Sequence, residues 1–129
     1  MTLTRDEVVD SFVEETGSRL VEMEDQLIAL QNADPDERDA LVNALFRHAH
    51  SIKGASNLLG YKDIEFLSHR MEHVLDMIRN QMLQPSPRIH EALIRGLDTI
   101  GAFLDHPEAG APDNLREVML LLSRVAVSG

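Results

Sequence analysis

Apolar residues recur along this chain at the three- and four-residue spacing of amphipathic helices, in five separate stretches. The first stretch runs from about Thr4 to about Gln31. Its apolar positions are Val8 or Val9, Phe12, Leu20, Met23, Leu27 and Leu30. Thr4 and Glu7 form a capping box that predicts the start of the helix. Gly17 lies inside the run and costs about 1 kcal/mol relative to Ala, so we predict a long helix with a weak centre.

A second helix is predicted to begin at the run Asp34-Pro35-Asp36-Glu37. Asp34 is a favourable N-cap, Pro35 suits the first helical position, and the acidic residues favour the positive end of the helix dipole. The apolar pattern continues to Leu58 or Leu59 and stops before Gly60, which predicts the end of the helix there.

Three further helices follow in the pattern. The third is predicted from Tyr61 to about Leu83 and is ended by Pro85 and Pro87. The fourth spans about residues 87–104, and the fifth spans about residues 113–127. The connections are short, which favours antiparallel neighbours. We therefore predict an all-α fold, an antiparallel up-and-down four-helix bundle with a fifth, C-terminal helix packed alongside.

The composition fits one domain over residues 1–129, with a bundle core over about 4–105. Aromatic residues make up only 4% of the chain and Trp is absent, so the core must consist of Leu, Ile, Val, Met and Ala. There are 12 Lys and Arg residues against 22 Asp and Glu, a net charge of −10. This charge argues against nucleic acid and anionic membranes as partners, because both attract basic proteins. We expect protein partners.

Two further features bear on location. The chain has no cysteine, which excludes disulfides and thiolate sites. The first 20 residues mix charged side chains into the pattern, unlike a signal peptide, and no later run is long enough to span a membrane. We expect a cytoplasmic protein without membrane insertion.

The second helix carries a distinctive group of side chains around His50. The apolar stripe of this helix is Leu41, Val42, Leu45, Ala49 and Ile52. His50 falls roughly 130° from the centre of that stripe and should face solvent or the flank of the bundle. Phe46 lies one turn before it, and Lys53 and Gly54 lie one turn after it. An imidazole beside a cation and a bare patch of backbone suits a carrier of phosphoryl groups that docks partners.

The third helix offers a possible partner for this imidazole. Glu72 lies at the edge of its apolar stripe, with His69 three positions earlier on the same flank. If the second and third helices are antiparallel neighbours, Glu72 can accept a hydrogen bond from one nitrogen of His50. The other nitrogen would then be a bare nucleophile. Alternatively, Glu72 forms a surface ion pair with Arg79 or Lys62.

Two runs carry a resemblance to a known family. The first is His50-Ser51-Ile52-Lys53-Gly54-Ala55-Ser56, with Leu45-Phe46-Arg47 before it and Leu59-Gly60-Tyr61 after it. The second is Ser68-His69-Arg70-Met71-Glu72-His73-Val74-Leu75-Asp76-Met77-Ile78-Arg79. Together they resemble histidine phosphotransfer (HPt) domains, most closely the N-terminal phosphotransfer domain of chemotaxis histidine kinases of the CheA type. The resemblance covers nearly the whole chain, and Asn57-Leu58-Leu59 departs from it where relatives often have smaller residues.

The resemblance implies roles for several residues. His50 would be the phosphoacceptor, Glu72 would orient its imidazole, Lys53 would supply charge near the phosphate, and His69 would complete the polar network. The residues expected to dock partners are Phe46, Arg47, Gly54 and Asn57. No cofactor is expected in the domain itself, because ATP and Mg²⁺ would belong to partner domains.

The function implied is that of a phosphoryl carrier in two-component chemotaxis signalling. His50 would accept a phosphoryl group from the catalytic domain of a CheA-type kinase and donate it to an aspartate of a CheY- or CheB-like receiver domain. The domain would act as substrate and relay rather than as an enzyme. The chain would be the N-terminal fragment of a sensor histidine kinase, or else a stand-alone phosphorelay protein. The alternative from another class is a helical interaction module without chemistry.

Simpler interpretations remain for individual residues. His50 could be an ordinary surface histidine, and Lys53 a solvated helix residue. His69 and His73 have the four-residue spacing of a metal-binding pair, but the HExxH order is absent and no metal site is expected. His48 lies at the border of the core stripe and is expected to be packed rather than reactive.

Overall fold

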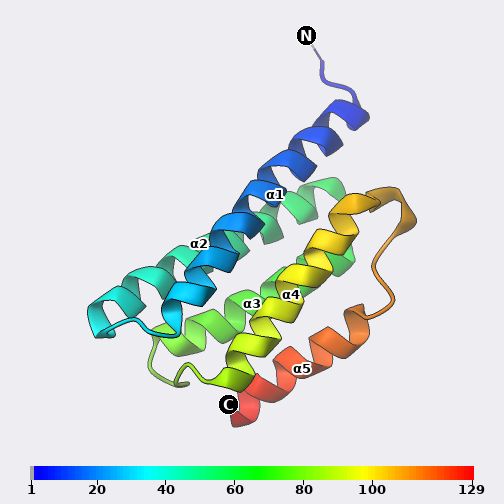
Figure 1. Ribbon diagram of the computed structural model, residues 1–129. Helices are drawn as coiled ribbons and strands as arrows, with labels where there is room; N and C mark the ends of the chain where they lie inside the picture. The colour runs from blue at the N-terminus through cyan, green and yellow to red at the C-terminus, as the bar shows by residue number, and fades with distance from the viewer. Residues whose placement is uncertain (1) are drawn as a thin grey trace.

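The computed structural model describes residues 2–129, which form five α-helices and a short 3₁₀ helix and contain no β-strand. The helices are α1 (Arg5–Leu30), α2 (Pro35–Leu59), α3 (Lys62–Arg79), α4 (Pro87–Asp105), the 3₁₀ helix η1 (Pro107–Ala109) and α5 (Leu115–Ser128). Successive helices run in opposite directions (Figure 1). None of the helices within residues 2–129 combines the length and the apolar character needed to cross a membrane.

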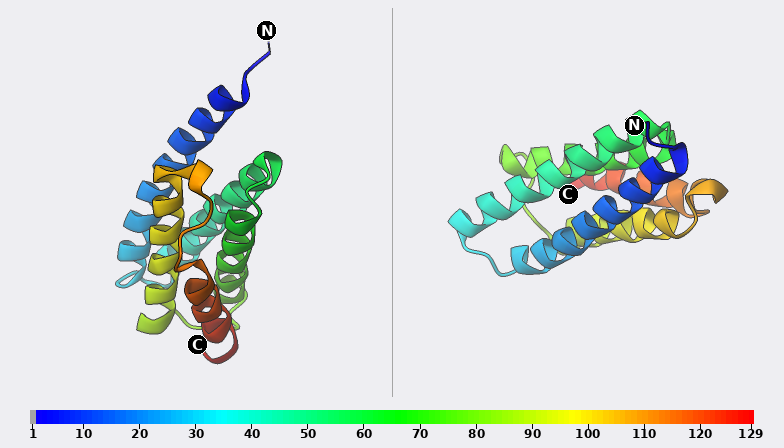
Figure 2. Two further views of the ribbon diagram at one scale, coloured as in Figure 1. Left: turned by 90° about the vertical axis from the view of Figure 1, so that its right-hand side faces the viewer. Right: turned by 90° about the horizontal axis from the view of Figure 1, so that it is seen from above.

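The first four helices close into a bundle. Packing contacts join α1 to α2, α2 to α3, α3 to α4 and α4 back to α1. The fifth helix lies outside this ring and packs on α3 and α4 (Figure 2). This arrangement confirms the predicted four-helix bundle with an additional C-terminal helix.

The start signals of the first two helices act largely as predicted. The Thr4 hydroxyl accepts a hydrogen bond from the backbone N–H of Glu7 at 3.1 Å, and Asp34 Oδ1 accepts one from Glu37 N–H at 2.9 Å. The Glu7 carboxylate returns to the Thr4 hydroxyl instead of its backbone N–H. α1 continues unbroken through Gly17, and the weakness of its centre stays a prediction.

The C-termini of α2 and α3 are each followed by a residue in the left-handed backbone conformation. Gly60 has φ 79°, and the next residue donates its N–H to Ser56 O at 2.9 Å. This is the Schellman closure that glycine permits without steric cost. It fixes where α2 stops and turns the chain directly into α3.

α3 is shorter than the sequence pattern indicates. It ends at Arg79 rather than near Leu83. Gln81 has φ 63°, and the N–H of Met82 donates to Met77 O at 2.8 Å. The end of α3 is therefore a Schellman motif like the one at Gly60, but with glutamine in the left-handed position. Apolar spacing continues past this point, which is why the pattern alone overestimates the helix.

The core is mainly aliphatic, but Phe12 and Phe103 are also buried in it, so the expectation of a core made only of Leu, Ile, Val, Met and Ala is wrong. One close contact in this core joins α3 to α4. Met71 is buried on α3 and lies over Gly96 of α4. A Cβ atom at position 96 would lie 2.7 Å from Met71 Sδ, closer than the two atoms can approach. α3 and α4 therefore pack together at a point where one residue has no side chain.

Candidate functional site

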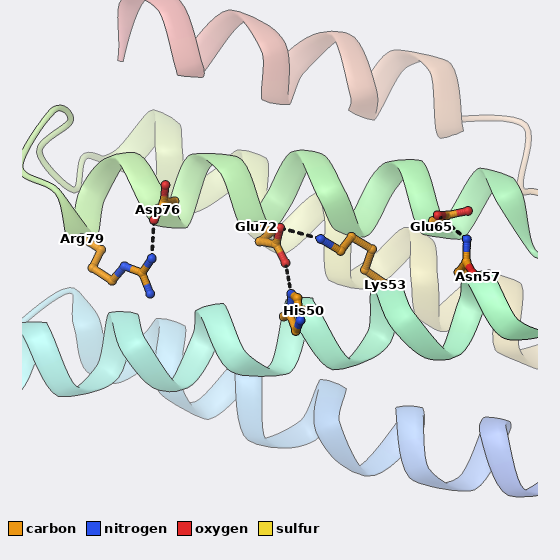
Figure 3. A network of polar contacts seen from close by, with 7 residues as sticks. All are labelled: His50, Lys53, Asn57, Glu65, Glu72, Asp76 and Arg79. Atoms are coloured by element: carbon orange, nitrogen blue, oxygen red, sulfur yellow. Dashed lines mark hydrogen bonds and ion pairs between the residues drawn. The ribbon is translucent and has the colours of Figure 1, made fainter.

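His50 lies midway along α2 and turns towards α3 (Figure 3). Its Nδ1 is 2.7 Å from Glu72 Oε2. An ionised carboxylate only accepts hydrogen bonds, so Nδ1 carries the hydrogen and donates it. The neutral ring then holds a lone pair on Nε2, which has no hydrogen-bond partner among residues 2–129. The side chain is 64% exposed, which makes this ring accessible to another protein.

Lys53 binds the other oxygen of the same carboxylate. Its Nζ donates to Glu72 Oε1 at 2.8 Å, and its side chain is 25% exposed. The two contacts occupy both oxygens of Glu72 and tie α2 to α3 at adjacent turns. Lys53 is therefore part of a bridge between helices rather than a freely solvated side chain.

Glu72 is the most enclosed member of this cluster, with a side chain only 12% exposed. Burial by itself raises the pKa of a carboxyl group, but hydrogen bonds from Lys53 and His50, together with their charges, outweigh it and lower the pKa of Glu72 below its ordinary value. The carboxylate is thus held ionised at neutral pH. The alternative of a surface pair with Arg79 or Lys62 is wrong, because Glu72 faces α2 and is bonded there.

Phe46 lies one turn before His50 against the imidazole. The two ring planes are inclined by only 12°, with centroids 6.3 Å apart. The far side of the site is open, because nothing lies within 4 Å of the position that a Cβ of Gly54 would occupy. The imidazole thus has an aromatic ring on one flank and bare helix surface on the other.

The remaining residues expected to dock partners lie on the same helix. Arg47 is exposed, and Asn57 is exposed and donates a hydrogen bond to Glu65 Oε2 at 2.8 Å. Phe46 is only half-buried and is covered in part by Arg79, whose guanidinium carbon lies 4.0 Å from the ring centroid. The docking roles of these residues stay predictions.

His69 is not joined to the cluster. No hydrogen bond or ion pair within residues 2–129 connects it to His50, Lys53 or Glu72. It is exposed and lines a shallow groove between α3 and α5 together with His73. In the part of the chain that is described, no third side chain joins these two histidines in a metal-binding group.

Two features near the site escaped the sequence interpretation. Arg79 pairs with Asp76 one turn earlier and lies on Phe46. His48, expected simply to be packed, bridges two α1 side chains: Arg19 Nη1 is 3.1 Å from its Nδ1, and Glu22 Oε2 is 3.0 Å from its Nε2. The three-residue spacing of Asp76 and Arg79 was a usable signal for the first feature, whereas the second depends on how α1 and α2 are aligned.

The Hpt domain family matches residues 7–103, which include both helices of the cluster. The chain belongs to the Hpt domain family. In this Hpt domain the matched range ends within α4, so α5 lies beyond it.

Curated relatives of this Hpt domain carry the name Chemotaxis protein CheA. The protein from Rhizobium meliloti (strain 1021) is 30% identical over 116 residues, which cover 89% of this chain and 15% of the relative. The protein from Bacillus subtilis (strain 168) is 31% identical over 121 residues, which cover 94% of this chain and 18% of the relative. The Hpt domain therefore spans less than a fifth of these relatives.

A solved structure resembles the whole domain. It is described as the phosphorylated P1 domain of CheA3 in complex with CheY6 from R. sphaeroides. The TM-score is 0.84 at 26% identity, with 95% of this chain and 98% of that chain covered. The match extends the agreement beyond the bundle core and supports the five-helix architecture.

Proposed function

We propose that this Hpt domain is a phosphoryl carrier in a chemotaxis phosphorelay, with His50 as the phosphoacceptor. The observation that carries the proposal is the 2.7 Å contact between His50 Nδ1 and Glu72 Oε2, which assigns the tautomer of the ring. Glu72 holds the hydrogen on Nδ1, and the Nε2 lone pair is left free on an exposed side chain. In the neutral ring such a nitrogen is a nucleophile without any further base.

The proposed transfers are two in-line displacements at phosphorus. In the first, the Nε2 lone pair forms a bond to the γ-phosphorus of ATP held by a CheA-type kinase domain, and the bond to the β,γ-bridging oxygen breaks to release ADP. The ring becomes positively charged, and the Glu72 carboxylate beside Nδ1–H stabilises that charge. In the second, an aspartate oxygen of a CheY- or CheB-like receiver attacks the same phosphorus and the N–P bond breaks, which returns the neutral imidazole.

The proposal divides the chemistry between domains. This domain contributes the nucleophile and its orientation, while ATP and Mg²⁺ are held by the partners, so it needs no cofactor of its own. Lys53, bonded to Glu72 beside the ring, would place a positive charge near the arriving phosphate. Arg47, Gly54 and Asn57 would form the surface on which partners dock.

The comparisons support the chemotaxis setting. The relatives are named as CheA proteins, and the similar solved domain is phosphorylated and bound to a CheY protein. We propose accordingly that the chain is the phosphotransfer part of a CheA-type kinase that acts in the cytoplasm. A stand-alone phosphorelay protein would use the same site.

The test is phosphorylation by the catalytic domain of a CheA-type kinase with labelled ATP. The wild-type chain should acquire a label that is lost in acid and retained in alkali, and His50→Gln should reduce labelling at least about 100-fold. His48→Gln is the matched control, because it removes a histidine from the same helix, and it should label within about twofold of wild type. Equal labelling of the wild type and His50→Gln would instead favour an interaction module without chemistry.

A further inference from the structure

One hydrogen bond does not fix the direction in which the His50 ring points. The contact with Glu72 restrains Nδ1, but a planar ring can still pivot about a single hydrogen bond, and this side chain is largely exposed. In-line attack requires the Nε2 lone pair to point along the bond that will break. A second restraint on the ring would therefore affect the rate of transfer without affecting the tautomer.

Phe46 supplies a surface for that restraint. Its ring is nearly parallel to the imidazole, with the 12° inclination and 6.3 Å separation of an offset aromatic pair. Because Phe46 precedes His50 by four residues, the two rings lie on the same face of α2. The orientation of Phe46 thus limits the positions that the imidazole can adopt.

Phe46 is in turn held by a cation from the neighbouring helix. The guanidinium carbon of Arg79 lies 4.0 Å from its ring centroid, well within the range of cation–π contacts. Arg79 is anchored by Asp76, which lies one turn earlier on α3. A continuous series of contacts therefore runs from Asp76 through Arg79 and Phe46 to the imidazole.

We propose that Arg79 is a positioning residue that acts through Phe46 to set the orientation of the His50 ring. The inference rests on the proposed function, since it assigns the restraint a purpose in phosphoryl transfer. It gives Arg79 a role separate from that of Glu72. Glu72 determines which nitrogen of His50 is nucleophilic, and the Arg79–Phe46 pair determines where that nitrogen points.

The kinetic test compares three variants with the wild type in steady-state phosphorylation by the kinase domain. Arg79→Gln removes the cation and should lower kcat about fivefold with KM unchanged. Arg79→Lys retains a cation that can lie on the ring and should recover most of the loss. Arg88→Gln, which removes an exposed positive charge from α4, is the charge-matched control and should match the wild type. A raised KM with normal kcat would overturn the proposal and make Arg79 a docking residue.

A double-mutant cycle tests the route through Phe46. Phe46→Leu should lower kcat by a similar factor, and Arg79→Gln combined with Phe46→Leu should lower it no further, because both changes interrupt one series of contacts. Multiplicative losses would show that the two residues act independently and would overturn the proposed route.

Nuclear magnetic resonance of the free domain separates this inference from the proposed function. In Arg79→Gln the ¹⁵N shifts of His50 should still report hydrogen on Nδ1, while the ring-current shift that Phe46 imposes on the imidazole protons should fall by about half. Unchanged imidazole proton shifts would overturn the inference even if labelling is normal. Absence of label in the wild type, with these shifts behaving as expected, would instead count against the phosphoryl carrier.

Discussion

His48 and His50 are separated by one residue of α2, yet their surroundings are opposite. His50 turns to α3 and donates from Nδ1 to a carboxylate. His48 turns to α1, where the guanidinium of Arg19 approaches Nδ1 and Glu22 approaches Nε2. A guanidinium only donates, so Nδ1 of His48 must accept and its hydrogen must lie on Nε2. These contacts therefore assign opposite tautomers to the two neutral rings.

The difference shows what makes one of two adjacent histidines a candidate nucleophile. In His48 the lone pair on Nδ1 accepts from Arg19, Glu22 Oε2 lies 3.0 Å from Nε2, and the side chain is only 14% exposed. In His50 only Nδ1 has a hydrogen-bond partner among residues 2–129, and the side chain is 64% exposed. Both residues are histidines on the same helix. They differ in which ring nitrogens are contacted by side chains of the neighbouring helix.

Removing the charge of Glu72 should have the largest effect on the difference between His50 and His48. In Glu72→Gln the side-chain amide can donate to Nδ1 as well as accept from it, so the ring should populate both tautomers and lose the charge that stabilises its cationic form. Phosphorylation should slow by about 10- to 100-fold. The measurement is the rate of label incorporation, accompanied by ¹⁵N shifts of the imidazole.

Glu22→Gln is the matched control for that experiment. It makes the same chemical change beside His48, and phosphorylation should stay within about twofold of the wild type. A wild-type rate in Glu72→Gln, with the Nδ1–H tautomer retained, would remove the orienting role assigned to this carboxylate.

The pH dependence of stability should distinguish the same residue. The pKa of Glu72 is lowered in the folded protein, so its ionised form stabilises the fold above the pKa of the unfolded chain, and this contribution is lost as the pH falls through the lowered folded value. The difference in unfolding free energy between the wild type and Glu72→Gln should be about 1 kcal/mol at neutral pH and should shrink in acid. Urea unfolding monitored by circular dichroism at several pH values measures it. A difference that is constant down to pH 3 would contradict the lowered pKa.

The smallest effect is expected at His48. Arg19→Ala removes the donor to Nδ1 and frees that lone pair, which should raise the rate at which diethylpyrocarbonate modifies His48 about threefold, the equivalent of a weak hydrogen bond. The rate at His50 should not change, and peptide mass spectrometry resolves the two sites. If the modification rate of His48 does not change, burial rather than Arg19 protects it. The two histidines would then differ in reactivity only because their side chains are exposed to different extents.

The sequence was sufficient to predict most of the helix bounds and the contact between His50 and Glu72. Helical spacing, the caps at Thr4 and Asp34, and Gly60 depend on local interactions that extend only a few residues, and they place four of the five helices within two residues of their observed bounds at both ends. The contact between His50 and Glu72 was also predictable, because a helix wheel gives the direction of a side chain and a short connection brings the two helices together.

The rest depended on interactions that periodicity does not encode. α3 ends early because Gln81 adopts a left-handed conformation, which sequence reasoning assigns first to glycine or asparagine. The bridge from His48 to Arg19 and Glu22 requires the axial alignment of α1 and α2. The sequence pattern placed His69 on the same flank as Glu72, three positions away, but in the structure Glu72 faces α2 whereas His69 lines the groove between α3 and α5.

Gly96 lies two contacts away from His50, because it packs on Met71, the neighbour of Glu72 in the sequence. Met71, which lies over Gly96, directly precedes Glu72 on α3. A shift of the α3 backbone at Met71 would therefore also shift the adjacent Glu72 carboxylate relative to α2. A Cβ at position 96 would lie 2.7 Å from Met71 Sδ, so either the flexible Met71 side chain or the backbone of α3 must move. Only a shift of α3 would change the contact between Glu72 and His50. The contact between Glu72 and His50 is thus linked, through the backbone of α3, to a glycine in the core of the bundle.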